Sequence, residues 1–498
     1  TAQQIRFLDE QTIQAQGITS VELMERAATA CVQWLERVLE KNQSINIVCG
    51  TGNNGGDGLV IARQLHQQGY MTRVVLLGDQ SKGSHDFQVN LRRLPSCLER
   101  IHVNKPDDYP EERVVVDALL GTGISREPSG LFAEVIERIN TSARRVYSID
   151  LPSGVPVFPD FIPHTAIQAD VVLSFEVVKP TFLLPEYSSW VADFDIIRIG
   201  WDEDALERLV VTDQFVDQAM AAGYYQPRNR FDHKGSMGRV GLVAGSKSMT
   251  GAAILSAMAA LRSGCGLCSV WTSGAVQPVF QCALPEAICM ADAHEAHITR
   301  VELGDRMDAV GIGPGLGTHS DTIHAVRTVL EQTHLPVVID ADALNAVDVN
   351  FLLELTEKNP TGVRVLTPHP GEFNRLFGPH ETRWGQIQTA RKMAKELQSW
   401  IVLKGAYTFL VGPDGCGWFN GSGTPALAKG GSGDVLTGVL TSVLTKYPVK
   451  QAVILGVYLH GLAAQLVEEV SHTESVLASE VADHLPAAWN ILEKPIKD

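Results

Sequence analysis

Residues 49–58 read CGTGNNGGDG and directly follow the apolar run INIVC at residues 45–49. Gly50, Gly52 and Gly55 have the spacing G-x-G-x-x-G, which is typical of a turn that leads from a strand into a helix and holds the pyrophosphate of a dinucleotide. The stretch therefore predicts a parallel α/β sheet with its ligand at the carboxyl ends of the strands.

The second half of this stretch departs from an ordinary dinucleotide turn. Such a turn leads straight into an apolar helix, whereas residues 53–58, NNGGDG, insert amides, a carboxylate and further glycines. An aspartate beside a pyrophosphate is repelled, but amide and carboxylate oxygens suit a hard cation. Two alternatives stay open at this point. Asp79 fits the ribose-binding acid of an NAD-linked oxidoreductase, and Asp57 fits a plain helix cap.

The bulk composition indicates a globular enzyme with two domains. A chain of 498 residues is too long for one ordinary hydrophobic core. Hydrophobic residues make up 45% and charged residues 20%, as in soluble globular proteins. The net charge of −16 repels nucleic acid and anionic membranes, so we expect neither as a partner. The composition leaves open whether the protein forms a homo-oligomer.

The apolar runs and the cysteines predict a cytoplasmic protein. We see no basic segment followed by an apolar one near residue 1, and no run of the roughly 18 apolar residues that a membrane span needs. The longest candidate, residues 452–467, contains His460 and is interpreted as a buried helix. Eight cysteines without a paired framework fit a reducing compartment. Cys265 and Cys268 are interpreted as buried thiols rather than zinc ligands.

The first part of the chain predicts a Rossmann-like, doubly wound domain at residues 1–211. Residues 12–42 have apolar positions at helical spacing and predict one long opening helix, with Thr19 or Ser20 as its cap. Short β-branched runs then alternate with amphipathic stretches, which is typical of a mostly parallel sheet. The runs are residues 45–50, 72–78, 113–121, 144–154, 169–175 and 195–200.

A second α/β series follows, after a linker that we place at residues 212–225. We expect this second domain at residues 226–498, beginning in a polar segment rich in proline and glycine. Its predicted strands are residues 238–246, 266–272, 307–317, 335–345, 363–373 and 400–412. Its predicted closing helices are residues 432–445, 451–469 and 476–492.

Three polar strand ends in the first domain point to one shared site. Asp117 ends one apolar run and leads into a glycine turn at residues 121–123, where Ser125 and Arg126 could grip a phosphate. Asp150 and Ser153 end the next run. Because the carboxyl ends of parallel strands share one edge of a sheet, these groups and the turn at 53–58 should converge.

These motifs, GNNGGDG, DALLGTGISR and IDLPSG, resemble the NAD(P)H-hydrate epimerase domain of the YjeF family. The resemblance covers roughly residues 1–211. It implies that Asn54, Asp117 and Ser153 help to bind K⁺, and that Asp150 faces the altered nicotinamide ring as an acid/base group. Lys179 is either a residue at the edge of this site or a surface lysine. The residues implied to hold the dinucleotide are Asn53, Asn54, Gly55, Gly56, Asp57, Gly121, Thr122, Gly123, Ile124, Ser125, Arg126 and Glu127.

The motif KGGSGDVLTG at residues 429–438 predicts a phosphate site in the second domain. Glycines at a helix start leave backbone N–H groups free to bind a phosphoryl oxygen, and the helix dipole adds to the attraction. Asp434 could accept the proton of an attacking hydroxyl. A flexible turn with a helix cap is the structural alternative. Other strand ends supply Asp340, Asp342, Asn345, His369, Glu372 and the segment 404–408.

Together with GPGLG, DADALN and TPHPGE, this motif resembles the ribokinase-like superfamily, and within it the ADP-dependent NAD(P)H-hydrate dehydratases. A sugar kinase would show Asn-x-x-Glu where this chain has His369 to Glu372. The resemblance implies Asp434 as the catalytic base and Glu372 as a Mg²⁺ residue acting through water. It implies substrate contacts from Ala252, Gly315, His369 and Asp434. It implies ADP and phosphate contacts from Lys404, Gly405, Ala406, Tyr407, Thr408, Gly430, Gly431, Ser432 and Gly433.

The two resemblances together imply one repair function. The substrates would be hydrated NADH and NADPH, with water added across the nicotinamide C5–C6 bond. The first domain would interconvert the R and S epimers, and the second would use ADP to dehydrate the S form through a phosphorylated intermediate. The alternatives are a ribokinase-like small-molecule kinase fused to a non-catalytic nucleotide-binding domain, the oxidoreductase, and an RNA-associated scaffold, which the net charge disfavours.

Overall fold

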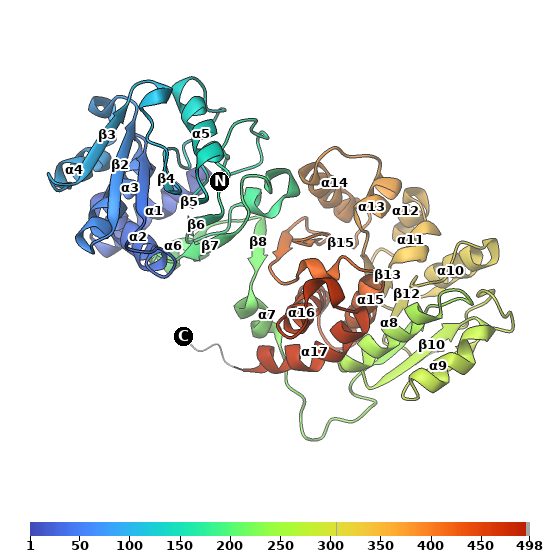
Figure 1. Cartoon of the computed structure of the whole chain (residues 1–498). Coiled ribbons are helices and arrows are strands. Elements are labelled where there is room, and N and C mark those ends of the chain that lie inside the picture. Colours follow the sequence, from blue (N-terminus) through green and yellow to red (C-terminus); the bar gives the residue numbers. More distant parts are fainter. Residues whose placement is uncertain (305, 495–498) are drawn as a thin grey trace. The chain divides into compact units, whose positions relative to one another are not determined.

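A computed structural model of the chain describes residues 1–304 and 306–494. The chain divides into two compact units, Thr1–Val210 and Val211–Asp498 (Figure 1). The last residue of the predicted second domain, 498, lies outside the described residues.

The first unit is built on a seven-stranded sheet in which every pairing is parallel. The strand order is β3-β2-β1-β4-β5-β6-β7, so the direction of winding reverses between β1 and β4. Strand β3 was not predicted, because it lies at the edge of the sheet and most of its side chains are exposed. The strands are β1 Ser44–Cys49, β2 Met71–Leu77, β3 Glu99–Val103, β4 Val114–Ala118, β5 Arg145–Ile149, β6 Val171–Phe175 and β7 Phe194–Ile197.

The predicted long opening helix is in fact two helices. Helix α1 ends at Gly17, which has a φ of 63° in the left-handed region that glycine favours, and Thr19 caps α2 by accepting a hydrogen bond from Glu22 N. The glycine interrupts a helical pattern that is otherwise continuous. The helices of this unit are α1 Ala2–Gln16, α2 Ser20–Leu35, α3 Asn53–Gln67, α4 His85–Arg93, α5 Leu131–Ser142 and α6 Glu203–Arg208.

The polar stretch at 53–58 is the start of α3 rather than an insertion. Gly52 is the helix N-cap, so the chain enters the helix at Asn53, and Asp57 lies within the helix instead of capping it. Both the expected insertion and the capping alternative are therefore wrong. A side chain at Gly55 could not fit, because its Cβ would lie 1.9 Å from Gly50 O. The close turn brings the first residues of α3 to the sheet edge.

The second unit has a ten-stranded sheet in the order β11-β10-β9-β12-β13-β14-β15-β16-β17-β8. The pairings are parallel except for those of β15 with β16 and of β16 with β17. Its winding reverses between β9 and β12. The strands are β8 Asp213–Val216, β9 Arg239–Val243, β10 Leu267–Thr272, β11 Ile288–Ala291, β12 Ala309–Ile312, β13 Val337–Ile339, β14 Arg364–Leu366, β15 Trp400–Leu403, β16 Phe409–Val411 and β17 Gly417–Asn420.

Residues 212–225 belong to the second unit and are not a linker, contrary to our expectation. Strand β8 pairs in parallel with β17, and α7, Gln218–Tyr224, follows it. The carboxylate of Asp213 also accepts a hydrogen bond from Arg391 at 2.8 Å. The prediction failed because the partner strand lies about two hundred residues further along the chain, where local sequence gives no hint of it.

Helices cover the second sheet, and the three predicted closing helices are confirmed as α15, α16 and α17. Among the described helices, α16 alone is long and apolar enough to cross a membrane by length and composition, and most of it is buried in this unit. The helices after α7 are α8 Thr250–Arg262, α9 Gln277–Ala283, α10 Ser320–Gln332, α11 Ala341–Asn345, α12 Val349–Lys358, α13 Pro370–Phe377, α14 Arg383–Glu396, α15 Ser432–Leu444, α16 Val449–Glu468 and α17 Ala478–Glu493.

Candidate active sites

A cavity of about 650 Å³ opens in the first unit, beside the carboxyl ends of β1 and β4. Helices α1 and α2 supply one wall, and the start of α3 and the turn after β4 supply the other. This is the point at which the strand order reverses, where open α/β sheets bind their ligands. The predicted residues that line the cavity are Asn53, Asn54, Asp57, Gly121, Thr122, Gly123, Ile124 and Asp150.

The three residues predicted to bind K⁺ lie together behind this cavity. Asn54 Nδ2 donates to Leu120 O at 2.9 Å, and Ser153 Oγ accepts from Leu120 N at 2.8 Å and donates to Asp117 Oδ1 at 2.6 Å. Burial raises the pKa of Asp117, although hydrogen bonds from Ser153 and Ser148 favour its charged form. Asn54 Oδ1 is buried without a hydrogen-bond partner among the described residues.

This donor set fits a bound cation. A buried amide oxygen without a partner costs free energy, and a monovalent cation would satisfy it. The neighbouring carboxylate and carbonyl oxygens are the hard ligands that such an ion prefers.

Asp150 and Lys179 form a buried ion pair at the edge of the cavity. Lys179 Nζ lies 2.6 Å from Asp150 Oδ1 and donates to Ser174 Oγ at 2.6 Å and to Phe175 O at 3.3 Å. Lys179 is only 1% exposed, so the alternative of a surface lysine is wrong. Asp150 lines the cavity and has a φ of 66°, a strained value for a residue with a side chain.

Five predicted dinucleotide residues do not line the cavity. The carboxylate of Glu127 is turned toward the backbone N–H groups of His164 and Thr165. Gly56 lies under Met24, where a Cβ would approach the sulfur to 2.8 Å, so this position allows close packing of α3 and α2. The predicted residues outside the cavity wall are Gly55, Gly56, Ser125, Arg126 and Glu127.

Asp9 and Asp57 are two carboxyl groups of the cavity wall whose pKa values are raised, and Asp9 was not predicted. Burial, together with the nearby Asp150 carboxylate, raises the pKa of Asp9 to about 6, although a hydrogen bond from Trp201 Nε1 at 2.8 Å opposes the shift. Burial and the charges of Asp150, Asp9 and Asp86 raise the pKa of Asp57 well above its usual range. The sequence signal that could have pointed to Asp9 is its position next to Leu8, an apolar residue of the amphipathic helix α1.

The ribose-binding role considered for Asp79 is not supported. Asp79 caps a short 3₁₀ turn, Gln80–Lys82, by accepting from Ser81 N at 3.1 Å, and it does not line the cavity.

In the second unit, the glycine motif forms the start of α15. Gly431 is the N-cap with a φ of 95°, and Val435 N makes the first intrahelical bond, to Gly431 O at 3.1 Å. The N–H groups of Gly433 and Asp434 therefore precede the hydrogen-bonded part of the helix and can bind an anion. Asp434 lies in the first turn and is not the cap, so capping does not explain it.

A charged cluster lies directly behind this helix start. Lys404 Nζ contacts Asp340 Oδ1 at 2.8 Å, and Thr437 Oγ1 donates to Asp340 Oδ2 at 2.8 Å. A Cβ on Gly433 would lie 3.6 Å from both Asp340 Oδ2 and Lys404 Nζ. The glycine turn and the cluster thus form one site.

The cluster sets the proton affinity of its members. Burial and the negative charge of Asp340 raise the pKa of Asp434 to about 6, against the effect of Lys404. Burial acts against the charge on Lys404, but the carboxylates of Asp340 and Glu372 outweigh burial and raise the lysine pKa. Asp434 can therefore both hold and release a proton near neutral pH.

His369 and Glu372 form a capping box at the start of α13. His369 Nδ1 accepts from the N–H groups of Gly371 and Glu372, and Glu372 Oε2 accepts from His369 N at 2.8 Å. Local structure alone thus explains part of this motif. Glu372 Oε2 also lies 3.8 Å from Lys404 Nζ, so the carboxylate faces the charged cluster.

The predicted substrate contacts Ala252 and Gly315 lie side by side. A Cβ on Gly315 would lie 2.7 Å from that of Ala252. Gly317 N donates to Asp342 Oδ2 at 2.8 Å, which anchors the glycine turn after β12. Asn345 Nδ2 contacts the other oxygen of Asp342 at 3.3 Å, so both side chains have a role in holding this turn.

The predicted nucleotide segment, residues 404–408, is the turn between β15 and β16. Arg383 supports it by donating to Leu403 O at 2.7 Å and to Lys404 O at 2.9 Å. Thr408 Oγ1 donates to Gly405 O at 3.1 Å. Gly405 and Ala406 are exposed at the tip of this turn, and Tyr407 is half-buried. Gly430, which is also exposed, directly precedes the N-cap of α15.

His460 lies next to the start of α15, and its place there was not predicted. It lies in α16, fully buried, and burial lowers its pKa to about 4 despite a hydrogen bond with the backbone of Ser432. Its Nε2 atom has no hydrogen-bond partner within the described residues. The only signal in the sequence was a histidine in an otherwise apolar helix.

Comparison with known proteins identifies both units. Residues 20–181 match the family model described as the YjeF-related protein N-terminus, and residues 240–487 match the one described as NAD(P)H-hydrate dehydratase. A bifunctional NAD(P)H-hydrate repair enzyme from Moorella thermoacetica is 33% identical over 100% of this chain and 97% of its own length. One from Thermofilum pendens is 31% identical, over 99% of this chain and 96% of its own length.

A solved structure shares the architecture of the second unit. It is an ADP/ATP-dependent NAD(P)H-hydrate dehydratase from Bacillus subtilis, co-crystallized with ATP and Mg²⁺. The match is 36% identical and covers 56% of this chain and 98% of that one, with a TM-score of 0.50.

Proposed function

This chain belongs to the family of bifunctional NAD(P)H-hydrate repair enzymes, and we infer that its two units perform the two reactions of that repair. The first unit is an NAD(P)H-hydrate epimerase, and the second is an NAD(P)H-hydrate dehydratase. At the level of single residues, the dehydratase assignment rests on the position and the pKa of Asp434. Its carboxylate has a pKa of about 6 and stands at a helix start whose N–H groups can bind phosphate.

In the dehydratase unit, we assign Asp434 as the base for phosphoryl transfer. The hydroxyl on C6 of the hydrate is a poor leaving group. Asp434 takes the hydroxyl proton while the oxygen attacks the terminal phosphoryl group of the nucleotide. The phosphoryl group is transferred to this oxygen, and AMP leaves when the donor is ADP. Loss of phosphate from C6 and of a proton from C5 then restores the dihydropyridine ring.

The protein stabilises this transfer mainly through charge. The N–H groups at Gly433 and Asp434 offer donors to the phosphoryl oxygens, as in other phosphoryl-transfer sites. Lys404, held by Asp340, adds a positive charge beside them. The similar dehydratase from Bacillus subtilis is named as ADP/ATP-dependent, and we propose ADP as the donor here.

The dehydratase site fits a magnesium ion. The carboxylate of Glu372 faces the cluster and keeps Oε1 outside the capping hydrogen bonds, so it can hold a hydrated ion through water. Bound Mg²⁺ would neutralise charge on the nucleotide phosphates.

In the epimerase unit, we propose that Asp150 and Asp9 act as an acid/base pair. Inversion at C6 requires the C6–O bond to break and to form again on the other face of the ring. The lone pair on N1 can assist departure of the hydroxyl as water, which leaves C6 planar, and water then adds from the opposite side. One carboxyl group supplies a proton and the other removes one. Both line the same cavity, and Lys179 orients Asp150.

We propose that K⁺ binds at Asn54, Asp117 and Ser153. The support is the unpartnered Asn54 Oδ1 and the adjacent carboxylate. Bound K⁺ would fix the turn after β4 and offer positive charge toward the phosphates of the substrate. We expect the enzyme to act on free hydrated NADH and NADPH in the cytoplasm, where its cysteines, all of them free, stay reduced.

The decisive experiment separates the two activities in one full-length protein. Purified R and S hydrates of NADPH are incubated with ADP, Mg²⁺ and K⁺, and recovery of absorbance near 340 nm is followed. Asp434→Asn should abolish recovery from both epimers but leave their interconversion intact. Asp150→Asn should slow recovery from the R form only. Asp483→Asn, which changes an exposed carboxylate on α17, serves as the control.

Other outcomes would contradict these assignments. If Asp434→Asn behaved like the parent protein, the dehydratase base would lie elsewhere. If recovery from the R form needed no functional first unit, the epimerase assignment of that unit would be wrong. If neither epimer were recovered, the alternative of a small-molecule kinase with a non-catalytic partner domain would be favoured.

A further inference from the structure

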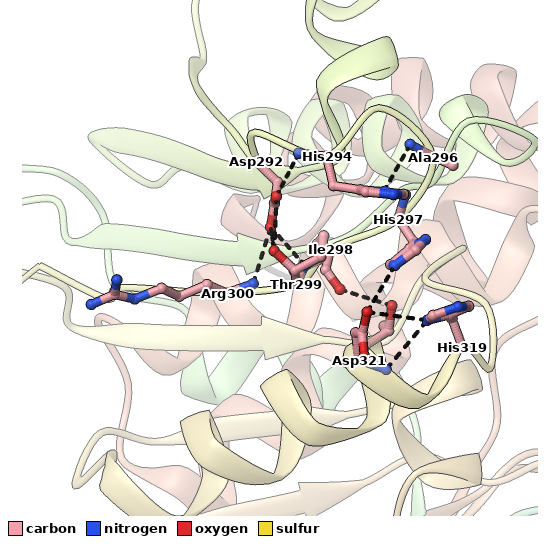
Figure 2. Close-up of polar contacts among 10 residues, drawn as sticks. Asp292, His294, Ala296, His297, Ile298, Thr299, Arg300, His319 and Asp321 are labelled. Carbon is pink, nitrogen blue, oxygen red and sulfur yellow. Dashed lines mark hydrogen bonds and ion pairs between the residues drawn. The ribbon is translucent and has the colours of Figure 1, made fainter.

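A second cluster of polar side chains lies in the second unit, apart from the residues assigned above. We name it the His–Asp cluster and define it as His297, His319 and Asp321. Asp321 Oδ2 lies 3.5 Å from His297 Nε2 and 3.7 Å from His319 Nδ1, as Figure 2 shows. The ligand atoms of all three lie within 4.8 Å of one another.

These separations are longer than a strong hydrogen bond and close to the separation of two ligands of one metal ion. A charge-assisted hydrogen bond between nitrogen and a carboxylate is about 2.8 Å long. Around a tetrahedral Zn²⁺ with bonds of about 2.0–2.1 Å, neighbouring ligand atoms lie roughly 3.4 Å apart. The observed distances of 3.5 and 3.7 Å from Asp321 Oδ2 to the two ring nitrogens are close to this separation.

The imidazole rings at the cluster lie against one another. The rings of His297 and His319 stack with centroids 3.8 Å apart, and the ring of His294 lies 3.9 Å from that of His297. The loop that carries His297 is therefore packed against His319, the N-cap of α10.

The backbone holds the ligands in place before any ion binds. The carboxylate of Asp292 accepts hydrogen bonds from the N–H groups of His294, Thr299 and Arg300, which close the loop that carries His297 (Figure 2). Thr322 Oγ1, in the first turn of α10, donates to Ile298 O at 2.9 Å. The loop and the helix that supply the ligands are thus already joined.

We propose that the His–Asp cluster binds one divalent transition-metal ion of the zinc class. Two imidazoles and a carboxylate are a donor set for Zn²⁺ or Co²⁺, whereas Mg²⁺ prefers oxygen ligands alone. His319 Nδ1 now accepts a long hydrogen bond of 3.3 Å from Asp321 N, which the metal bond replaces. Water completes the coordination, because the exposed side of His319 and Asp321 faces solvent.

The position of the cluster gives the ion a structural role. The loop with His297 contacts the segment between β9 and α8, since Lys247 N donates to Ala296 O at 3.1 Å. His319 follows Gly317 of the glycine turn, which Asp342 anchors. A bound ion therefore fastens two loops that border the turn containing Gly315. The proposal does not depend on the catalytic assignments.

The test uses the full-length protein after treatment with a chelator. Co²⁺ is titrated in the presence of excess Mg²⁺, and the visible absorption of tetrahedral cobalt is recorded together with Zn²⁺ binding by calorimetry. We expect one site per chain that Mg²⁺ does not compete for. His297→Ala should weaken Zn²⁺ binding roughly a hundredfold and remove the cobalt bands.

A matched control and a second variant keep the test decisive. His324→Ala, one turn further along α10 and exposed, should bind Zn²⁺ like the parent protein. Asp321→Asn leaves both rings in place and should also weaken binding at least tenfold. Equal affinity in the parent protein and in these two ligand variants, or the absence of tetrahedral cobalt bands, would overturn the proposal.

Discussion

The buried pair of Lys179 and Asp150 should show a large energetic coupling. Asp150→Asn leaves the Lys179 ammonium, 1% exposed, without its charged partner and with only neutral acceptors, which are Ser174 Oγ, Phe175 O and the amide oxygen of the new side chain. An unpaired buried charge of this kind costs about 3–5 kcal/mol. Lys179→Met should cost less, about 1–3 kcal/mol, because Asp150 borders the cavity and still accepts from Phe175 N at 3.2 Å.

The double variant Asp150→Asn/Lys179→Met removes both charges and should be more stable than Asp150→Asn alone. Hydrogen exchange, measured by mass spectrometry on peptides from β5 and β6, reports the local stability of these strands. The measurement does not require that a protein with two units unfolds in one cooperative transition. Asp150→Asn should speed exchange there by roughly a hundred- to several-thousandfold. If the two single effects simply added, within about 0.5 kcal/mol, the ion pair would not exist as described.

The remaining predictions concern pH, cation dependence and packing. Dehydration needs Asp434 deprotonated, and its pKa is raised to about 6, so kcat/KM should fall about tenfold per unit below pH 6; a fall only below pH 4 would contradict the assignment. If Asp9 supplies a proton in epimerisation, that rate should fall above pH 6, and Asp9→Asn should remove this limb of the profile. Asn54→Leu should abolish stimulation of epimerisation by K⁺ in a salt titration with Na⁺ as control. Gly313→Ala should lower the unfolding temperature of the second unit by several degrees in calorimetry, because the new Cβ would lie 1.7 Å from Asp340 O. An unchanged unfolding temperature would show that the turn can move to make room for the methyl group.

Local sequence signals predicted most of the fold, and long-range contacts explain what they missed. Buried β-branched runs and glycine turns were sufficient for the first sheet and for the parallel part of the second. Edge elements such as β3 and β8 lack that pattern, since part of their surface faces solvent or their partner is distant in the chain.

The sites show the same division. Strand ends such as Asp117 and Asp340 were found because residues at the carboxyl ends of neighbouring strands converge. Asp9 and His460 come from helices that approach the sites only after folding, so spacing along the sequence could not reveal them. The pKa of Asp434 likewise depends on Asp340 and Lys404, which lie elsewhere in the sequence and outside its motif.

Strand β8 has a consequence for dissecting the protein into separate pieces. It is made before the rest of its sheet and must wait until β17 has been synthesised before it can pair. A fragment that started at residue 226 would lack β8 and would leave the N–H and C=O groups along one edge of β17 unpaired. Such an exposed strand edge promotes aggregation. A fragment that starts at residue 211 keeps this edge covered and should stay monodisperse in light scattering, whereas the shorter one should aggregate.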